Sequence, residues 1–376
     1  MMHCIDEVPE GNLKGKRVLV RSGLDLPLNT AGNVSDIFRL TQACETIKYL
    51  SSAGARSIVI SKIGRDPKDT NAPVAAAMKK FFPVFFVPAL SGHAVESAIG
   101  AMRDGDIILL ENLQQDPREV AGDDSFAKEL AALADIYVND AFTSAHRRSA
   151  SMTGIPKFLP SYAGLLLRDE VNQLDAARKP ASPSFAILGG AKFETKAPLV
   201  KSLLTAYDHL FIVGALANDV FKAKGYEVGI SLISNELPDE DVLAHSHFLA
   251  PVDVTVERPD GQARTKKANE VLPDENIVDI GPDSIQMIAP LIAQAKSILW
   301  SGPTGIYERG YISYTHATAD LISKSDAKKV IGGGDTIAAI QETGVPEEQL
   351  GFLSTGGGAM LEYLLKGTLP AIQALS

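Results

Sequence analysis

The sequence of 376 residues is poor in several features that would place it in a common functional class. Its two cysteines, Cys4 and Cys44, cannot form a disulfide framework or, by themselves, a zinc site. No stretch approaches the roughly 18 consecutive apolar residues of a membrane-spanning helix, and the opening MMHCIDEVPEG lacks the basic start and apolar run of a secretion signal. The 36 basic and 46 acidic side chains leave a formal charge of −10, which argues against nucleic-acid binding. We therefore expect a cytoplasmic protein without nucleic-acid or membrane partners.

Familiar catalytic fingerprints are also absent. The sequence has no G-x-x-x-x-G-K-[ST], and neither GGGDTI (332–337) nor GGGAML (356–361) has the spacing G-x-G-x-x-G. Neither a P-loop ATPase nor a standard dinucleotide-binding enzyme fits. No Ser–His–Asp or Cys–His arrangement is recognisable. A carboxylate acceptor is already ionised at neutral pH and needs no general base, so transfer of a group to a carboxylate is compatible with this absence.

Short apolar runs alternate with segments of helical spacing through both halves of the chain. Because the strand-like runs are almost continuously apolar, they indicate parallel sheets covered on both faces, and hence an α/β fold. The expected strands lie at 17–21, 57–61, 84–87, 106–112, 135–140, 185–190, 209–215, 251–256, 297–303, 328–335 and 351–358. Helical spacing in the first half covers roughly 36–52, 72–82 and 123–134.

The length suits two domains, and one segment is suited to join them. Residues 162–180 place leucines and a valine at helical spacing with charges on the other face, and Pro180 follows. This pattern predicts a long helix between two α/β domains. The charged, Gly- and Pro-containing segment 257–276 is expected to be a surface loop.

Glycine-rich turns follow three of the expected strands in the second half, at 189–190, 332–334 and 356–358. In open parallel sheets ligands bind at the carboxyl ends of strands, and glycine lets the backbone approach an anion closely. One such loop is explained by a tight strand–helix connection, but three on one sheet edge indicate a polyphosphate site. Lys192 and Lys196 share a helix face beside the first loop. Asp335 would serve as a plain helix cap or, beside a triphosphate, as a magnesium ligand.

The first half instead places arginines at its strand ends. Arg21 ends the first strand, Arg65 follows the second, Arg147 follows the fifth, and Arg39 begins a helix. Any one of these could be an ordinary surface arginine. Together, in an acidic protein, they indicate a small polyanion, since guanidinium binds phosphate and carboxylate bidentately.

The motifs also match a known family, and in its order. They are KRVLVR (16–21), TIKYL (46–50), IGR (63–65), LLENL (109–113), YVNDAF (137–142) with AHR (145–147), AILGGAK (186–192), DIGP (279–282), WSGPTGIYE (300–308), VIGGGDT (330–336) and STGGGAMLE (354–362). With these motifs the sequence resembles phosphoglycerate kinase over essentially its whole length. The resemblance implies two Rossmann-like three-layer domains with parallel sheets facing across a hinged cleft, and a phosphotransferase of glycolysis that acts as a monomer.

The resemblance further implies an organisation of the chain. Residues 1–162 would bind the acceptor, 3-phosphoglycerate, residues 163–180 would form the interdomain helix, and residues 181–365 would bind Mg²⁺ with ATP or ADP. Residues 366–376 would return to the first domain.

Carried over residue by residue, the resemblance implies three groups of site residues. Catalysis would involve Arg39, Lys192, Gly357 and Gly358. Nucleotide binding would involve Gly190, Ala191, Lys192, Lys196, Gly214, Pro303, Glu308, Gly333, Gly334, Asp335, Thr336 and Gly356, with Asp335 as the metal ligand. Substrate binding would involve Arg21, Asp25, Arg39, Lys62, Arg65 and Arg147.

This sequence departs from the family pattern mainly around the acceptor. Gly23 stands where the family has the Asp that holds the substrate hydroxyl, and Asp25 replaces an Asn. Lys62 replaces a His, and Gln114 replaces an Arg of the phosphate patch. Three readings therefore stay open: a phosphoglycerate kinase with an altered acceptor site, a paralogue that phosphorylates another anionic carboxylate, and a non-catalytic relative that binds nucleotide or metabolite.

Overall fold

The computed structural model describes residues 2–376, which divide into two compact units. The chain up to Asn172, together with Thr368–Ser376, forms the amino-terminal unit, and Gln173–Gly367 form the carboxyl-terminal unit. The division falls within helix α7 (Leu165–Arg178), which occupies most of the segment 162–180 in which a long helix was predicted. No helix in the described part of the chain is long and apolar enough to cross a membrane.

The amino-terminal unit is built on one parallel sheet of six strands in the order β3-β4-β2-β1-β5-β6. These strands are β1 (Arg17–Ser22), β2 (Arg56–Ile60), β3 (Phe85–Val87), β4 (Ile107–Leu110), β5 (Ile136–Asp140) and β6 (Ser161–Ala163). All but the short β6 were predicted from their apolar runs. The central strand β1 pairs with β2 on one side and with β5 on the other, so the strand order reverses there.

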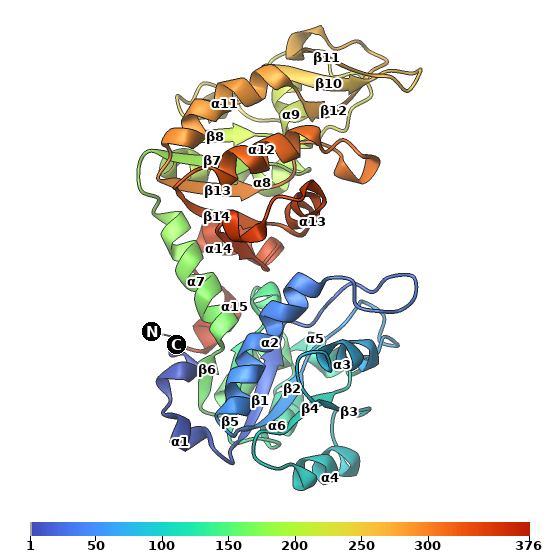
Figure 1. The fold of residues 1–376 in the computed structure, drawn as a ribbon, viewed down its shortest axis with the longest axis vertical. Helices are drawn as coiled ribbons and strands as arrows, with labels where there is room; N and C mark the ends of the chain where they lie inside the picture. Colours follow the sequence, from blue (N-terminus) through green and yellow to red (C-terminus); the bar gives the residue numbers. More distant parts are fainter. Residues whose placement is uncertain (1) are drawn as a thin grey trace. The chain divides into compact units, whose positions relative to one another are not determined.

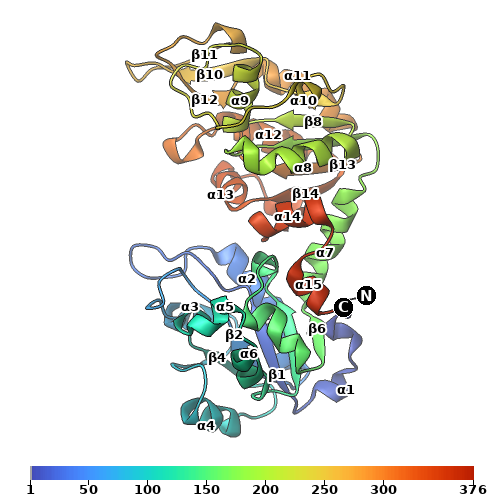
Figure 2. The same ribbon diagram turned by 180° about the vertical axis from the view of Figure 1, so that it is seen from behind.

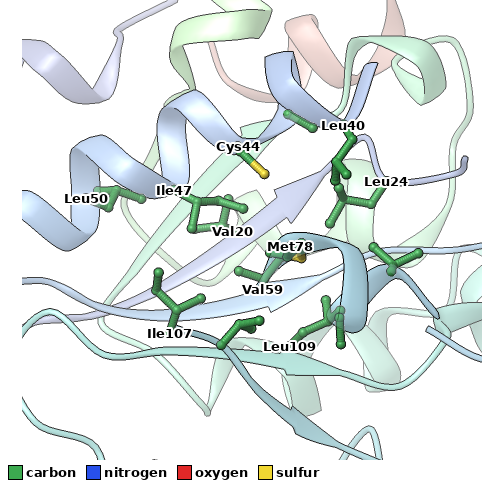
Figure 3. Close-up of a cluster of buried hydrophobic side chains, with 14 of the residues drawn as sticks. Val20, Leu24, Leu40, Cys44, Ile47, Leu50, Val59, Met78, Ile107 and Leu109 are labelled. Carbon is green, nitrogen blue, oxygen red and sulfur yellow. The ribbon is translucent and has the colours of Figure 1, made fainter. Parts of the chain in front are cut away.

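Helices cover both faces of this sheet, with α2 over one face and α6 over the other (Figures 1 and 2). The helices of the unit are α1 (Glu10–Leu13), α2 (Ile37–Ser52), α3 (Ala72–Met78), α4 (His93–Ala101), α5 (Pro117–Ala121), α6 (Asp124–Ala131) and α15 (Pro370–Ala374). Figure 3 shows the core beneath α2, where Leu40, Cys44 and Ile47 of the helix point toward strand residues such as Val20 and Val59. This burial is the driving force that holds helix and sheet together.

The carboxyl-terminal unit has a second parallel sheet of six strands, in the order β15-β14-β13-β7-β8-β9. These strands are β7 (Ser184–Leu188), β8 (His209–Ile212), β9 (Phe248–Leu249), β13 (Ser297–Ser301), β14 (Lys328–Gly332) and β15 (Phe352–Ser354). Helix α8 covers one face, and α11 and α12 cover the other (Figures 1 and 2). The helices are α8 (Phe193–Ala206), α9 (Ala215–Ala223), α10 (Glu240–Leu243), α11 (Pro282–Gln294), α12 (Ser313–Ser323), α13 (Gly334–Thr343) and α14 (Gly358–Lys366). The predicted α/β class with parallel sheets is confirmed for both units.

Two expectations about the segment 251–276 are wrong. Strand β10 (Asp253–Glu257) does not join the parallel sheet, and residues 257–276 are not one surface loop. Instead β10 lies between β11 (Ala263–Lys267) and β12 (Asn276–Ile280) in a small antiparallel sheet. The exposed edge strand β11 reads ARTKK, and a polar, charged edge strand carries no apolar signal that could reveal it.

Candidate functional site

In the carboxyl-terminal unit, glycine loops meet where the strand order reverses, between β7 and β13. The loop after β7 and the loop after β13 touch: a Cβ placed on Gly302 would lie 2.5 Å from the Cα of Gly189. Gly189 N also donates to Ser301 O at 2.6 Å. Because no side chain fits between these backbones, both loops need glycine to close the switch point at which α/β sheets bind ligands.

Lys192 stands at the start of α8 in an unusual conformation. Its φ is +65° and its ψ is +75°, and no other non-glycine residue between positions 2 and 376 has a positive φ. A side chain in this left-handed region is strained, and such strain is found where the surrounding structure enforces it. Four residues on, Lys196 is half-buried in the first turn, and burial lowers the pKa of its ammonium group.

The loops after β13 and β14 are tied to each other by a side chain. Thr336 Oγ1 accepts a hydrogen bond from Gly302 N at 2.7 Å. Gly333, with φ +102°, precedes helix α13, and Asp335 lies in the first turn of that helix. Gly333 is the N-cap residue and no side chain caps the helix, so Asp335 is not the predicted cap. Its carboxylate is stabilised by the helix dipole in the first turn, and Asp335 lines the cavity described next.

A cavity of about 570 Å³ lies along this sheet edge. Six of the residues predicted to bind nucleotide line it: Gly190, Ala191, Gly214, Pro303, Glu308 and Asp335. The other predicted nucleotide ligands lie in the same or neighbouring loops but are not part of its wall: Lys192, Lys196, Gly333, Gly334, Thr336 and Gly356. The cavity is therefore built from four of the loops at the carboxyl edge.

Part of the cavity lining is apolar and was not foreseen from the sequence. It includes Phe221 from α9, Val254 from β10 and Ile277 from β12. An apolar lining together with glycine loops suits an apolar ring attached to a charged tail. One feature of the sequence could have revealed this apolar lining. Val254 and Val256 alternate with polar residues, a pattern that indicates one apolar face of a half-exposed strand.

Asp279 also lines the cavity and was missed as a site residue. Its carboxyl group is almost fully buried, and burial raises its pKa to about 7, although a hydrogen bond with Thr304 opposes the shift. Oδ1 of Asp279 accepts from Ile280 N at 2.8 Å. The carboxyl group thus anchors the loop after β13 to the small antiparallel sheet.

The third glycine loop precedes α14. Gly357 has φ +50° and caps the helix, and Gly358 is exposed. A Cβ on either residue would meet nothing within 4 Å, so the space beside both residues is open. Exposed helix N-termini of this kind bind anions.

The carboxyl edge of the amino-terminal unit carries the other predicted residues, again where the strand order reverses, between β1 and β5. Gly23 follows β1, and a Cβ there would lie 3.4 Å from Thr143 Oγ1, an ordinary contact. The hydroxyl of Thr143 is buried and has no hydrogen-bond partner. A buried hydroxyl without a partner destabilises the fold. A side chain at residue 23 with a hydrogen-bond acceptor could pair with the Thr143 hydroxyl.

Asp25 and Lys62, both departures from the family pattern, form an ion pair. The Lys62 side chain is 11% exposed and that of Asp25 is 34% exposed. Asp25 Oδ1 also accepts from Gly64 N at 3.0 Å. The two departures therefore compensate each other, because the extra anion neutralises the extra cation.

Arg21 occupies a different environment from the one predicted for it. Its guanidinium is buried and donates to Ser151 Oγ at 3.0 Å and to the Ser22 carbonyl oxygen at 2.6 Å. Ser151 in turn donates to Glu119 at 2.6 Å. These contacts give Arg21 a role in the fold.

The remaining arginines stay accessible. Arg39, in the first turn of α2, pairs with its own N-cap residue Asp36 at 2.5 Å. Arg65 and Arg147 are exposed. Gln114, which replaces an arginine of the family, donates to the Arg65 carbonyl oxygen at 2.9 Å and so packs against the same loop without adding charge.

Comparisons with known proteins agree with this picture. Residues 6–367 match the family model described as phosphoglycerate kinase. The chain is 39% identical to the phosphoglycerate kinase of Desulfosudis oleivorans, and the alignment covers 97% of this chain and 97% of that relative. It is 38% identical to the phosphoglycerate kinase of Aquifex aeolicus, and the alignment covers 96% of this chain and 96% of that relative. Among solved structures, phosphoglycerate kinase from Coxiella burnetii superimposes with a TM-score of 0.84 at 33% identity, covering 100% of this chain and 99% of that one.

Proposed function

The chain belongs to the phosphoglycerate kinase family, and from this premise we propose how its residues divide the reaction between them. The reaction is a reversible phosphoryl transfer between ATP and the carboxylate of 3-phosphoglycerate, which yields ADP and 1,3-bisphosphoglycerate. In our proposal residues 181–365 bind the nucleotide, residues 1–162 bind the acceptor, and the tail 366–376 belongs with the acceptor domain. We also propose that the protein acts as a monomer in the cytoplasm.

The cavity along the carboxyl edge of the second sheet is the observation that carries this assignment. Apolar side chains line this cavity together with Gly190, Gly214 and Pro303, and Glu308 and Asp335 add two carboxylates to its lining. A nucleotide has the matching chemistry, since its base is flat and largely apolar while its phosphates seek backbone N–H groups at helix starts.

The chemistry asked of these residues is electrostatic. A carboxylate oxygen of the acceptor forms a bond to the γ-phosphorus as the bond to the bridging oxygen of ADP breaks, and no proton has to move. In our proposal Lys192 neutralises the phosphoryl group in transfer, and the N–H groups of Gly357 and Gly358 steady its oxygens. Arg39 would hold the acceptor carboxylate. Charges fixed in advance act most strongly in a site from which water is excluded.

Magnesium fits the residues present. Within residues 2–376 no three His, Cys, Asp or Glu side chains form a cluster that could hold a metal alone. Asp335 offers one carboxylate on the wall of the cavity. Mg²⁺ is ordinarily held by one or two carboxylates together with substrate phosphates, so we propose that Asp335 holds the ion that the nucleotide brings. When bound, the ion would neutralise phosphate charge.

A second candidate, a paralogue for another anionic carboxylate, is favoured by the contacts around the acceptor. Gly23 offers no side chain, Gln114 adds no charge, and the Lys62 ammonium is already paired with Asp25. A non-catalytic relative is less favoured, because binding alone does not require the strained Lys192.

A coupled assay of ADP formation separates these readings. The protein is supplied with Mg-ATP and, in turn, 3-phosphoglycerate and a panel of phosphorylated and unphosphorylated small acids. Turnover with 3-phosphoglycerate supports the proposed reaction, and turnover only with another acid supports the paralogue. Binding of ADP in calorimetry without turnover of any acid supports the non-catalytic relative.

A further inference from the structure

The strained backbone of Lys192 is held by a segment that is remote in sequence. The strap between α9 and α10, residues 229–237, passes the start of α8 and places Ser234 beside it. Phe193 N, the first N–H after Lys192, donates to Ser234 Oγ at 2.8 Å. This bond fixes the amide on the carboxyl side of Lys192.

The other end of the same peptide group is fixed as well. The Lys192 carbonyl oxygen accepts from Thr195 N at 3.1 Å and from Thr195 Oγ1 at 2.8 Å. With both its C=O and its N–H bonded, the peptide group between Lys192 and Phe193 cannot turn without losing these hydrogen bonds. The orientation of this peptide sets the ψ angle of Lys192 and thereby the direction in which its side chain leaves the backbone.

Ser234 is itself held in place by a buried carboxylate. Asp219 on α9 is fully buried, and its two oxygens accept from Ser234 N at 2.7 Å and from Ser234 Oγ at 2.8 Å. Because the hydroxyl hydrogen points to Asp219, a lone pair of Ser234 Oγ is left to accept from Phe193 N. The neighbouring Asn218 donates to the Leu232 carbonyl oxygen at 3.1 Å and ties the same strap to α9 a second time.

We propose that Ser234, oriented by Asp219, is a positioning residue for phosphoryl transfer that holds Lys192 in its left-handed conformation. The inference rests on the proposed function in that Lys192 is the cation aimed at the moving phosphoryl group. Ser234 does not line the cavity, and its hydrogen bonds go to Asp219 and to the peptide after Lys192. Its effect therefore belongs to the transition state and not to the affinity for nucleotide.

The strap supplies a matched control. Ser231 also accepts a backbone hydrogen bond at 2.8 Å, but from Ile277 N in the small antiparallel sheet and not from the start of α8. Ser231→Ala removes the same kind of bond from the same strap without touching the peptide after Lys192.

The first test is kinetic. Ser234→Ala should lower kcat by about 5- to 10-fold, the effect of one hydrogen bond, and leave the KM for ATP unchanged. Ser234→Thr, which keeps the hydroxyl, should restore kcat, and Ser231→Ala should retain the kcat of the parent. In a Lys192→Ala background, Ser234→Ala should add no further loss. An unchanged kcat in Ser234→Ala, or a full additional loss in the double variant, would overturn the proposal.

The second test needs no activity. A crystal structure of Ser234→Ala should show the peptide group between Lys192 and Phe193 turned and the ψ angle of Lys192 away from +75°, while the Ser231→Ala structure should keep the parent peptide orientation and ψ. The parent peptide orientation and ψ in both variants would contradict the inference even if the enzyme is active. Failure of the parent protein to turn over any acid would instead count against the proposed function, and the ψ angle of Lys192 would still decide the role of Ser234.

Discussion

Gly23→Asp is the substitution that should change acceptor use most. The family places there the Asp that holds the substrate hydroxyl, and losing a charged hydrogen-bond partner typically costs about 1.5–3 kcal/mol, or roughly 10- to 150-fold in kcat/KM. The structure has room for a Cβ at residue 23: the nearest atom to it is Thr143 Oγ1 at 3.4 Å, and the next is Ala141 Cα at 3.7 Å. Gly23 is not among the residues with positive φ, so a side chain adds no backbone strain.

The measurement is kcat/KM for 3-phosphoglycerate in the coupled assay, with Gly23→Ala as the control that adds a methyl group but no carboxylate. We expect the kcat/KM of the unaltered protein for 3-phosphoglycerate to lie below the roughly 10⁴–10⁸ M⁻¹s⁻¹ of ordinary enzymes. Gly23→Asp should raise this kcat/KM by roughly 10- to 100-fold. The reasoning is refuted if the unaltered protein already lies within that range. It is equally refuted if Gly23→Asp and Gly23→Ala behave alike.

Asp25 and Lys62 have to be changed together in any fuller restoration. The Lys62 side chain is only 11% exposed, so Asp25→Asn alone would leave a nearly buried ammonium without its partner. Removing one member of such a pair costs more than removing both. We therefore expect Asp25→Asn combined with Lys62→His to be more stable to denaturant than Asp25→Asn alone.

Three further predictions concern the nucleotide site and stability. Lys192→Ala should lower kcat by at least about 100-fold, as loss of one transition-state donor does, while calorimetry finds nearly unchanged ADP affinity; equal losses in both would refute its role. Asp335→Asn should weaken the dependence of activity on magnesium concentration, and an unchanged magnesium titration would leave Asp335 only the role of a first-turn carboxylate on α13. Asp140 is fully buried at the end of β5, and burial raises its pKa to about 7. Between about pH 4 and pH 7 the folded state therefore holds a proton on Asp140 that the unfolded state has released. Its contribution to stability should therefore be present at low pH and decline as pH rises from about 4 to 7. Asp140→Asn should flatten that part of the pH profile in urea denaturation, and an identical profile would refute the assignment.

The parallel sheets could be predicted because their strands are buried on both faces and read as continuous apolar runs. Strands such as VLV of β1 and ILL of β4 carry this signal within a few residues. The antiparallel sheet could not, since β11 is exposed and charged. The positions of the glycine loops followed directly from the strand ends, and the loops after β7, β8, β13 and β14 contribute residues to the cavity.

The side-chain environments depended on contacts between distant residues, which the sequence does not display. Arg21 and Ser151 are 130 positions apart, and their hydrogen bond is what turns a strand-end arginine into a buried one. Asp25 and Lys62 are 37 positions apart, so in the sequence each is an isolated change of charge. The structure shows that the two side chains form an ion pair. The strain at Lys192 had no sequence signal, because the bond that holds it comes from Ser234, 41 positions from Phe193.

The central claim is that this chain transfers a phosphoryl group to a carboxylate. It is tested most directly by identifying the phosphorus-containing products formed from ATP. The protein with Mg-ATP and 3-phosphoglycerate is examined by ³¹P NMR, with hydroxylamine added to trap acyl phosphate. The account predicts ADP, a trapped hydroxamate and the inorganic phosphate that hydroxylamine displaces from the acyl phosphate in equal amounts, at a rate lowered at least about 100-fold by Lys192→Ala. Release of inorganic phosphate without hydroxamate, or no consumption of ATP with any carboxylic acid while ADP still binds, would contradict it.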